Sequence, residues 1–168
     1  MRRLVAFGLI ALAGCSVAGD EKSIDEARVD DLLLQPADVG RGFHSTYARN
    51  LADRPIAEVW YRRVREPLSI ASAAHVFVSG EAAEKRLEAE RSALDEKPGW
   101  QPIGEPGLGD ESFAATVVQG GMRSYTVFWR HGNATASLGV IARQDELPFA
   151  DVVELARKQQ RRIADAET

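Results

Sequence analysis

The sequence is poor in the residues that build covalent or metal-based sites. Its 168 residues include a single cysteine, so no disulfide can form within the chain and no CxxC redox motif is possible. The three histidines are His44, His75 and His131, and none stands at the spacing of a zinc motif. We therefore expect neither a metal nor a cofactor.

Long apolar runs and an excess of positive charge are also missing. The apolar stretch 4–14 has eleven residues, whereas a membrane-spanning helix needs about 20. The chain carries 21 Lys and Arg against 25 Asp and Glu. An acidic protein has no general attraction for nucleic acid or anionic lipid, so we expect no nucleic-acid partner.

The first fifteen residues have the layout of a secretory signal. Arg2 and Arg3 precede the apolar stretch, and small residues precede Cys15. Cleavage before Cys15 leaves 154 residues, with 19 basic residues against 25 acidic ones and a net charge of −6. That length suits one domain with a hydrophobic core.

The segment Leu12-Ala13-Gly14-Cys15 resembles the lipobox of bacterial lipoproteins. The resemblance implies that residues 1–14 are a signal peptide, that Cys15 receives fatty acyl chains, and that the membrane is a partner through this lipid. Residues 15–22 are then a lipidated tether and 23–168 a single domain. The alternative is an ordinary signal peptide, or a buried strand, that happens to contain a cysteine. Whether the membrane is inner or outer stays open.

Periodicity and turn residues predict the elements that follow the tether. We expect a helix over 23–34 with Ser23 as its N-cap, a structured turn over 35–43, and strands over 56–65 and 70–79. A thin apolar stripe predicts a helix over 80–97, and the segment 100–109 reads as a loop because of its prolines and glycines.

The second half of the chain predicts an antiparallel meander and a closing helix. Strands are expected over 111–118, 122–130 and 134–141, joined by short glycine-containing connections. An amphipathic helix begins at Pro148. The predicted class is α+β, an antiparallel sheet of about five strands with helices packed on it and an amphipathic C-terminal helix.

Three short segments are similar to those of small extracytoplasmic lipoproteins from high-GC bacteria. They are the segment 32–43 with Asp38, the segment 107–111 before the meander, and the segment 156–159 in the last helix. Some domains of this kind are compared with the PsbP-like fold. The resemblance implies a fold and an extracytoplasmic location but no reaction.

Aromatic and basic residues supply the candidate binding residues, which are Trp60, Arg63 and Trp100. Trp60 precedes an arginine-rich strand end, 62–65, which could bind an anion or a peptide carboxylate. The alternative is a solvated edge strand whose charges discourage aggregation. Trp100 stands in a loop between two prolines and is the tryptophan that we expect to reach a ligand.

Neither the glycine-rich segment nor the histidines match a known catalytic or nucleotide-binding motif. The glycine-rich segment 104–112 lacks the Lys-Ser/Thr of a phosphate loop and leads into a strand, so we interpret it as a turn. Ser112 does not lie in the Gly-x-Ser-x-Gly pattern of a nucleophile elbow. His75 and His131 could meet Asp110 or Glu111 in space, but packed or exposed imidazoles are the simpler interpretation.

Three functional hypotheses remain. The first, which we prefer, is a lipid-anchored extracytoplasmic binding module, not an enzyme, that holds a small ligand or partner protein between sheet and helices. The second is a structural or assembly subunit of a cell-envelope complex. The third is an enzyme that uses His75 and His131 with acidic residues, and it requires these two imidazoles to lie close together.

Overall fold

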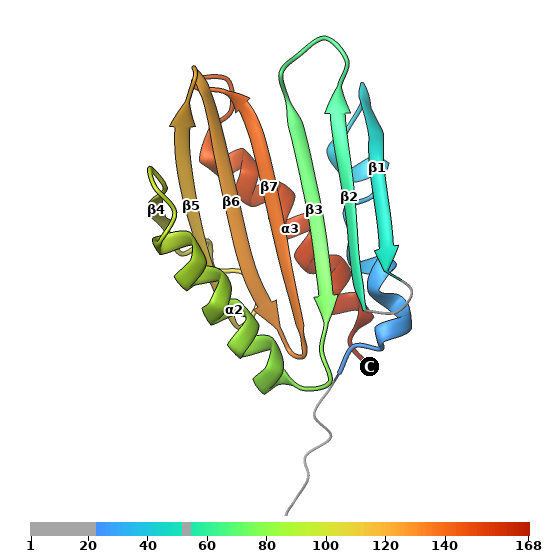
Figure 1. Cartoon of the computed structure of the whole chain (residues 1–168). Helices are drawn as coiled ribbons and strands as arrows, with labels where there is room; N and C mark the ends of the chain where they lie inside the picture. Colours follow the sequence, from blue (N-terminus) through green and yellow to red (C-terminus); the bar gives the residue numbers. More distant parts are fainter. Residues whose placement is uncertain (1–22, 52–54) are drawn as a thin grey trace, which may run out of the picture.

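The computed structural model describes residues 23–51 and 55–168 and contains one sheet of seven strands (Figure 1). The order across the sheet is β1-β2-β3-β7-β6-β5-β4, and every neighbouring pair is antiparallel. The strands are β1 (Phe43–Leu51), β2 (Ile56–Arg63), β3 (Ser69–Val76), β4 (Gln101–Gly104), β5 (Glu111–Gln119), β6 (Met122–His131) and β7 (Ala134–Arg143). The predicted α+β class is confirmed.

The expected strand number of about five was too low because both edge strands were missed. β1 is exposed and mixes polar with apolar residues, so it lacks a regular alternation. β4 contains Pro102 and Gly104, which favour a loop in sequence. An edge strand tolerates proline because one side of it has no strand to bond, and β4 pairs with β5 alone.

The meander of β5, β6 and β7 forms as predicted. Gly120 and Gly121, between β5 and β6, have φ of 59° and 75°, and Gly132, between β6 and β7, has φ of 55°. Tight hairpins need positive φ at such positions, and glycine adopts it without steric cost. The turn chemistry therefore sets the register of these three strands.

One face of the sheet, which we call the α3 face, holds the main core. It is covered by the 3-10 helix η1 (Glu26–Leu32) and by α3 (Phe149–Ala166). α3 buries one stripe against the sheet, as its apolar spacing predicted, and Pro148 is its N-cap. The buried sheet residues of this face include Val59, Ile70, Val127, Trp129 and Leu138.

The first predicted helix differs from the expected one in type and cap. η1 is a 3-10 helix, and its N-cap is Asp25, whose carboxylate accepts a hydrogen bond from the Ala27 N–H at 2.9 Å. Ser23 was the expected cap. Aspartate is at least as good a cap as serine, and its position two residues further on moves the helix start. Within the predicted turn 35–43 lies a single helical turn, α1 (Pro36–Val39).

Basic residues of α3 bind α1 through hydrogen bonds and an ion pair. Arg162 Nε lies 2.8 Å from the Asp38 carboxylate, and Lys158 Nζ donates to the Asp38 carbonyl at 2.6 Å. The Gln35 N–H also donates to Asp38 at 2.8 Å. Two of the sequence segments that resemble extracytoplasmic lipoproteins thus meet in space.

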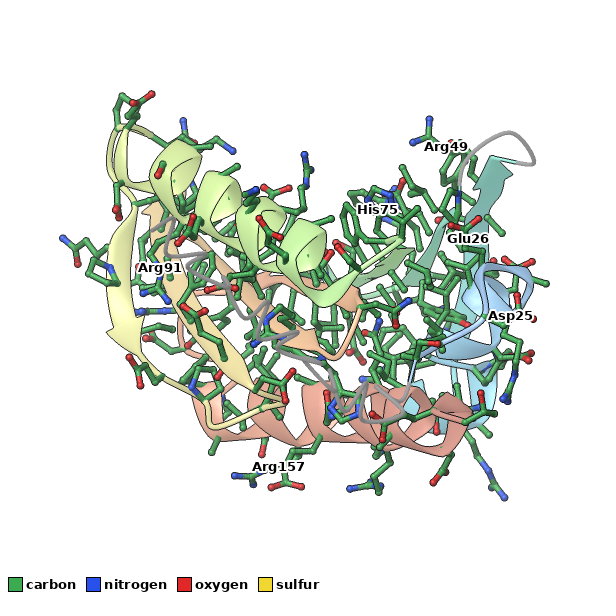
Figure 2. The ribbon with its side chains drawn as sticks, turned by 90° about the horizontal axis from the view of Figure 1, so that it is seen from below. Asp25, Glu26, Arg49, His75, Arg91 and Arg157 are labelled. Atoms are coloured by element: carbon green, nitrogen blue, oxygen red, sulfur yellow. The ribbon has the colours of Figure 1, made fainter. Side chains whose placement is uncertain are left out.

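The opposite face, which we call the α2 face, is only partly covered. α2 (Gly80–Asp95) crosses β6 and β7 and buries only Ala83 and Leu87. Seen from below, α2 and α3 lie on opposite sides of the sheet (Figure 2). No helix of the described chain lies over β1, β2 and β3 on this face (Figure 1). In the same described segments, no helix is long and apolar enough to cross a membrane.

Candidate ligand-binding cavity

Small residues form the floor of a hollow on the α2 face. Side chains alternate between the faces of a sheet, and residues directly opposite each other share a face. Ala71 lies opposite Gly139, and Ala73 lies opposite Ser137, on the central strands β3 and β7. Because these side chains are short, the sheet surface is low between β2 on one side and α2 on the other.

Two tryptophans line one cavity over this floor, which we call the tryptophan cavity. It has a volume of about 170 Å³, and Trp60 reaches it from β2 while Trp100 reaches it from the connection between α2 and β4. Hydroxyl groups of Ser69, Ser124 and Thr126 also line the cavity, and Ile141, opposite Ser69, adds an aliphatic side chain. The structure therefore brings together two of the three residues predicted to bind a ligand.

Each of the two indoles is held in place by a polar neighbour. The Trp60 Nε1–H donates to the Glu58 carboxylate, and 37% of Trp60 is exposed. The Trp100 ring lies 5.4 Å from Lys97 Nζ, within range of a cation–π contact. Both indoles thus have polar contacts that position them, and both remain partly exposed.

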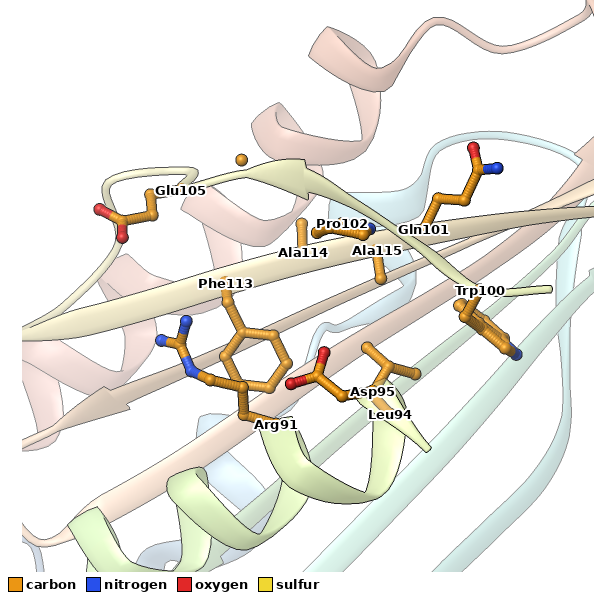
Figure 3. Close-up of a pocket in the computed structure, with 11 residues that line it drawn as sticks. Arg91, Leu94, Asp95, Trp100, Gln101, Pro102, Glu105, Phe113, Ala114 and Ala115 are labelled. Carbon is orange, nitrogen blue, oxygen red and sulfur yellow. The ribbon is translucent and has the colours of Figure 1, made fainter. Parts of the chain in front are cut away.

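A second cavity shares Trp100 as its wall and lies between α2 and β4 (Figure 3). Its volume is about 270 Å³. Arg91, on α2, lies over the Phe113 ring at 4.6 Å and is paired with Glu111 at 2.8 Å, so its charge is balanced. The carboxylates of Asp95 and Glu105 also line this cavity, which makes its surroundings acidic.

A third cavity, of about 120 Å³, lies at the other end of the floor beside His75. The His75 ring lies against the Phe77 ring, with the centroids 3.8 Å apart and the planes tilted by 36°. Burial, and then the positive charge of Arg86, lower the pKa of His75 below its usual value. His75 is therefore a neutral imidazole at pH 7.

Arg62, rather than the predicted Arg63, lies on the α2 face with Trp60. Arg63, the next residue of the strand, belongs to the opposite face of the sheet. Its guanidinium lies 4.8 Å from the Phe43 ring and pairs with Glu66 at 2.6 Å. Arg62 lies opposite Ser69 of the tryptophan cavity. Period-two alternation applied to the segment from Trp60 onward would have selected Arg62 from the sequence.

The histidine pair required by the enzyme hypothesis is not formed. His75 lies on the α2 face, beside α2. His131 lies opposite Ala134 on the α3 face and contacts Gln160 of α3 at 3.2 Å. No group of three or more potential metal ligands occurs within residues 23–51 and 55–168.

The glycine-rich segment 104–112 is structural, as interpreted from the sequence. Gly109 has φ of 55°, and a Cβ there would lie 2.0 Å from the Arg130 carbonyl oxygen. Asp110 accepts hydrogen bonds from Arg130 at 2.9 Å and from the Gly132 N–H at 2.8 Å. Ser112 Oγ accepts from the Leu108 N–H at 3.1 Å. These contacts fasten the start of β5 to the β6–β7 hairpin.

Comparison with known proteins identifies a related fold. No protein-family model matches the chain, and no curated protein matches it. The extracellular domain of PknH from Mycobacterium tuberculosis is similar in structure, with a TM-score of 0.63 and 10% sequence identity. The match covers 84% of this chain and 99% of that domain. At this identity the likeness shows the fold alone. The lipobox lies outside the described residues, and the PsbP-like fold stays a prediction.

Proposed function

We propose that the protein is an extracytoplasmic module, anchored to the membrane by lipid on Cys15, that binds a small ligand in the tryptophan cavity without catalysis. The binding proposal is supported by the position of two tryptophans. Trp60 and Trp100 come from segments far apart in the chain and line a single cavity over a floor of small residues. Ligand sites are concave, largely apolar, and lined by aromatic residues with a few polar groups.

The extracytoplasmic location is supported by the signal-like N-terminus and by the nature of the structural neighbour. That neighbour is the extracellular domain of another protein. Two or three acyl chains on one cysteine would hold the protein at a bilayer without help from its surface, since each buried CH₂ contributes about 0.8 kcal/mol. An acidic domain needs such an anchor at an anionic membrane.

The anchor is tested with Cys15→Ser. We expect this variant to lose incorporation of labelled palmitate and to move from the membrane fraction to the soluble or precursor fraction. Ser16→Ala, which leaves the cysteine in place, is the control and should remain in the membrane fraction. Membrane association of Cys15→Ser with an unchanged mass, apart from the substitution, would contradict the lipid anchor.

Binding is tested with the processed protein labelled with ¹⁵N-tryptophan, which carries three indole N–H signals. A small-molecule library is screened for compounds that shift the Trp60 and Trp100 signals. Trp129 is fully buried on the α3 face and serves as an internal control. Failure of every compound, and of a cell-envelope extract, to move the first two signals would count against the cavity as a binding site.

A second candidate is a structural or assembly subunit of a cell-envelope complex. Tyr47 lies opposite Trp60 on the α2 face, and their exposed fractions of 45% and 37% favour a protein contact at this edge. Crosslinking in cells distinguishes the candidates. A stable partner that is lost in Tyr47→Ala supports the complex, whereas recovery of no protein supports the small-ligand module.

A further inference from the structure

The size of the tryptophan cavity, which is open to solvent on one side, matches one ring. Its volume is about 170 Å³, and an apolar cavity of about 150 Å³ is enough to hold benzene. The inference below rests on the proposed function, because it names the ligand class of the same cavity.

The lining favours an aromatic ring. Two indoles form walls, and the floor between them is made by Ala71 and Gly139. Aromatic rings gain energy from stacking and edge-to-face contacts with other rings beyond the area that they bury. The neighbouring polar groups, Ser69, Ser124 and Thr126, carry hydroxyls and no charge. A ring in this cavity would therefore meet aromatic faces at its sides and neutral groups beneath.

The charged groups around the cavity are unevenly distributed. Glu58 lies beside Trp60, but its carboxylate accepts the indole hydrogen bond and lies 3.8 Å from Arg49 Nη2, so its charge is compensated. Arg62 lies two residues beyond Trp60 on the same face, exposed and opposite Ser69. Within the described residues 23–51 and 55–168, Arg62 contacts no carboxylate.

This distribution of charge determines at which end of the cavity an anionic group of the ligand is favoured. On the Trp100 side, Lys97 Nζ lies 5.4 Å from the indole ring, but the carboxylates of both Asp95 and Glu105 line the cavity beyond it, so the charge there is negative on balance and repels an anion. At the other rim, Arg62 lies opposite Ser69 of the cavity lining and itself lines the adjoining surface hollow, in which the Glu66 carboxylate is paired with Arg63. An anionic group on a ring in the tryptophan cavity is therefore favoured at the Arg62 rim, where guanidinium can bind a carboxylate through two parallel hydrogen bonds.

We propose that the tryptophan cavity binds a single-ring aromatic carboxylate, with its ring between Trp60 and Trp100 and its carboxylate on Arg62. Arg62 acts as a specificity-determining residue in this arrangement. It selects the anion, whereas the indoles select the ring.

The test uses three probes of similar shape: phenylacetate, its uncharged amide phenylacetamide, and cyclohexylacetate, which keeps the charge but lacks the aromatic ring. Each is titrated into the processed full chain while the tryptophan indole N–H signals are recorded. Trp60→Phe and Trp100→Phe assign the signals. We expect phenylacetate to shift both and to leave the Trp129 signal in place. It should bind about three to five times more tightly than phenylacetamide, as one solvent-screened charge-assisted contact allows. A similar preference over cyclohexylacetate is expected, because that probe lacks the aromatic contacts with the indoles.

Arg62→Gln tests the charge recognition directly. The side chain is exposed, so the fold should persist, and an unchanged Trp129 signal checks this. We expect the preference for phenylacetate over phenylacetamide to disappear. The control is Arg157→Gln on α3, on the far side of the molecule (Figure 2), which removes one positive charge and should keep the preference.

Three results would overturn the proposal: equal binding of phenylacetate and its amide, a preference that survives in Arg62→Gln, or equal binding of cyclohexylacetate. If no probe binds but another class of compound shifts the Trp60 and Trp100 signals, the ligand class is wrong and the binding module stands. If nothing shifts these signals, the proposed function fails as well.

Discussion

At the scale of single residues, the backbone at Gly109 requires glycine. Its φ of 55° disfavours a side chain, and the 2.0 Å separation between a built Cβ and the Arg130 carbonyl oxygen leaves no room for one. Any substitution must displace the backbone that joins β5 to the β6–β7 hairpin, where Asp110 holds Arg130 and Gly132.

We predict that Gly109→Ala lowers the free energy of unfolding by at least about 2 kcal/mol, since left-handed backbone alone costs an alanine about 1–2 kcal/mol. Urea unfolding followed by far-UV circular dichroism measures the change. Gly107→Ala is the matched control, because Gly107 has φ of 68° but open space around its Cβ position. Equal losses in the two variants would show that the backbone approach at Gly109 does not matter.

At the scale of elements, the link between α1 and α3 depends on the ionisation of Asp38. Burial alone would raise the pKa of Asp38, but the hydrogen bond from the Gln35 N–H, the hydrogen bond and charge of Arg162, and the charge of Lys158 together lower it. A carboxyl whose pKa is lower in the folded state stabilises the fold above its unfolded pKa, about 3.9. This contribution is lost as the pH falls through the folded pKa.

We therefore predict that Asp38→Asn lowers the free energy of unfolding by about 1 kcal/mol at pH 7. The difference from the unsubstituted protein should shrink as the pH falls below about 4. Urea unfolding at several pH values gives the comparison. Asp145→Asn, at an exposed turn position after β7, should leave the pH profile unchanged. A difference for Asp38→Asn that is constant down to low pH would contradict the role of its charge.

At the scale of the whole molecule, a substitution on the partly covered α2 face can stabilise the fold and at the same time weaken ligand binding. Gly139 lies in the middle of β7, and a Cβ there would meet only the Ala71 Cβ, at an ordinary contact distance of 3.7 Å. An alanine fits this site without strain and reduces the freedom of the unfolded chain. It also raises the floor of the tryptophan cavity.

We predict that Gly139→Ala raises the free energy of unfolding by about 0.5 kcal/mol and the melting temperature by about 1–2 °C, while weakening binding in the tryptophan cavity. Thermal unfolding and phenylacetate titration measure the two effects on one variant. Tighter binding in this variant would show that the ring does not rest on the β3–β7 floor.

Features that depend on local chemistry can be predicted from the sequence. Glycines with positive φ close the hairpins of the meander, and an apolar stripe places α3, because these requirements lie within a few residues of one another. The edge strands and the tryptophan cavity depend on contacts between distant segments. Edge strands such as β4, with its Pro102, form only because a neighbouring strand is present. The two-residue alternation of β2 places Arg62, rather than Arg63, on the side of Trp60, but only the packing of α2 on the sheet brings Trp60 and Trp100 into one cavity. Such relations depend on contacts between distant segments, which local sequence patterns do not encode.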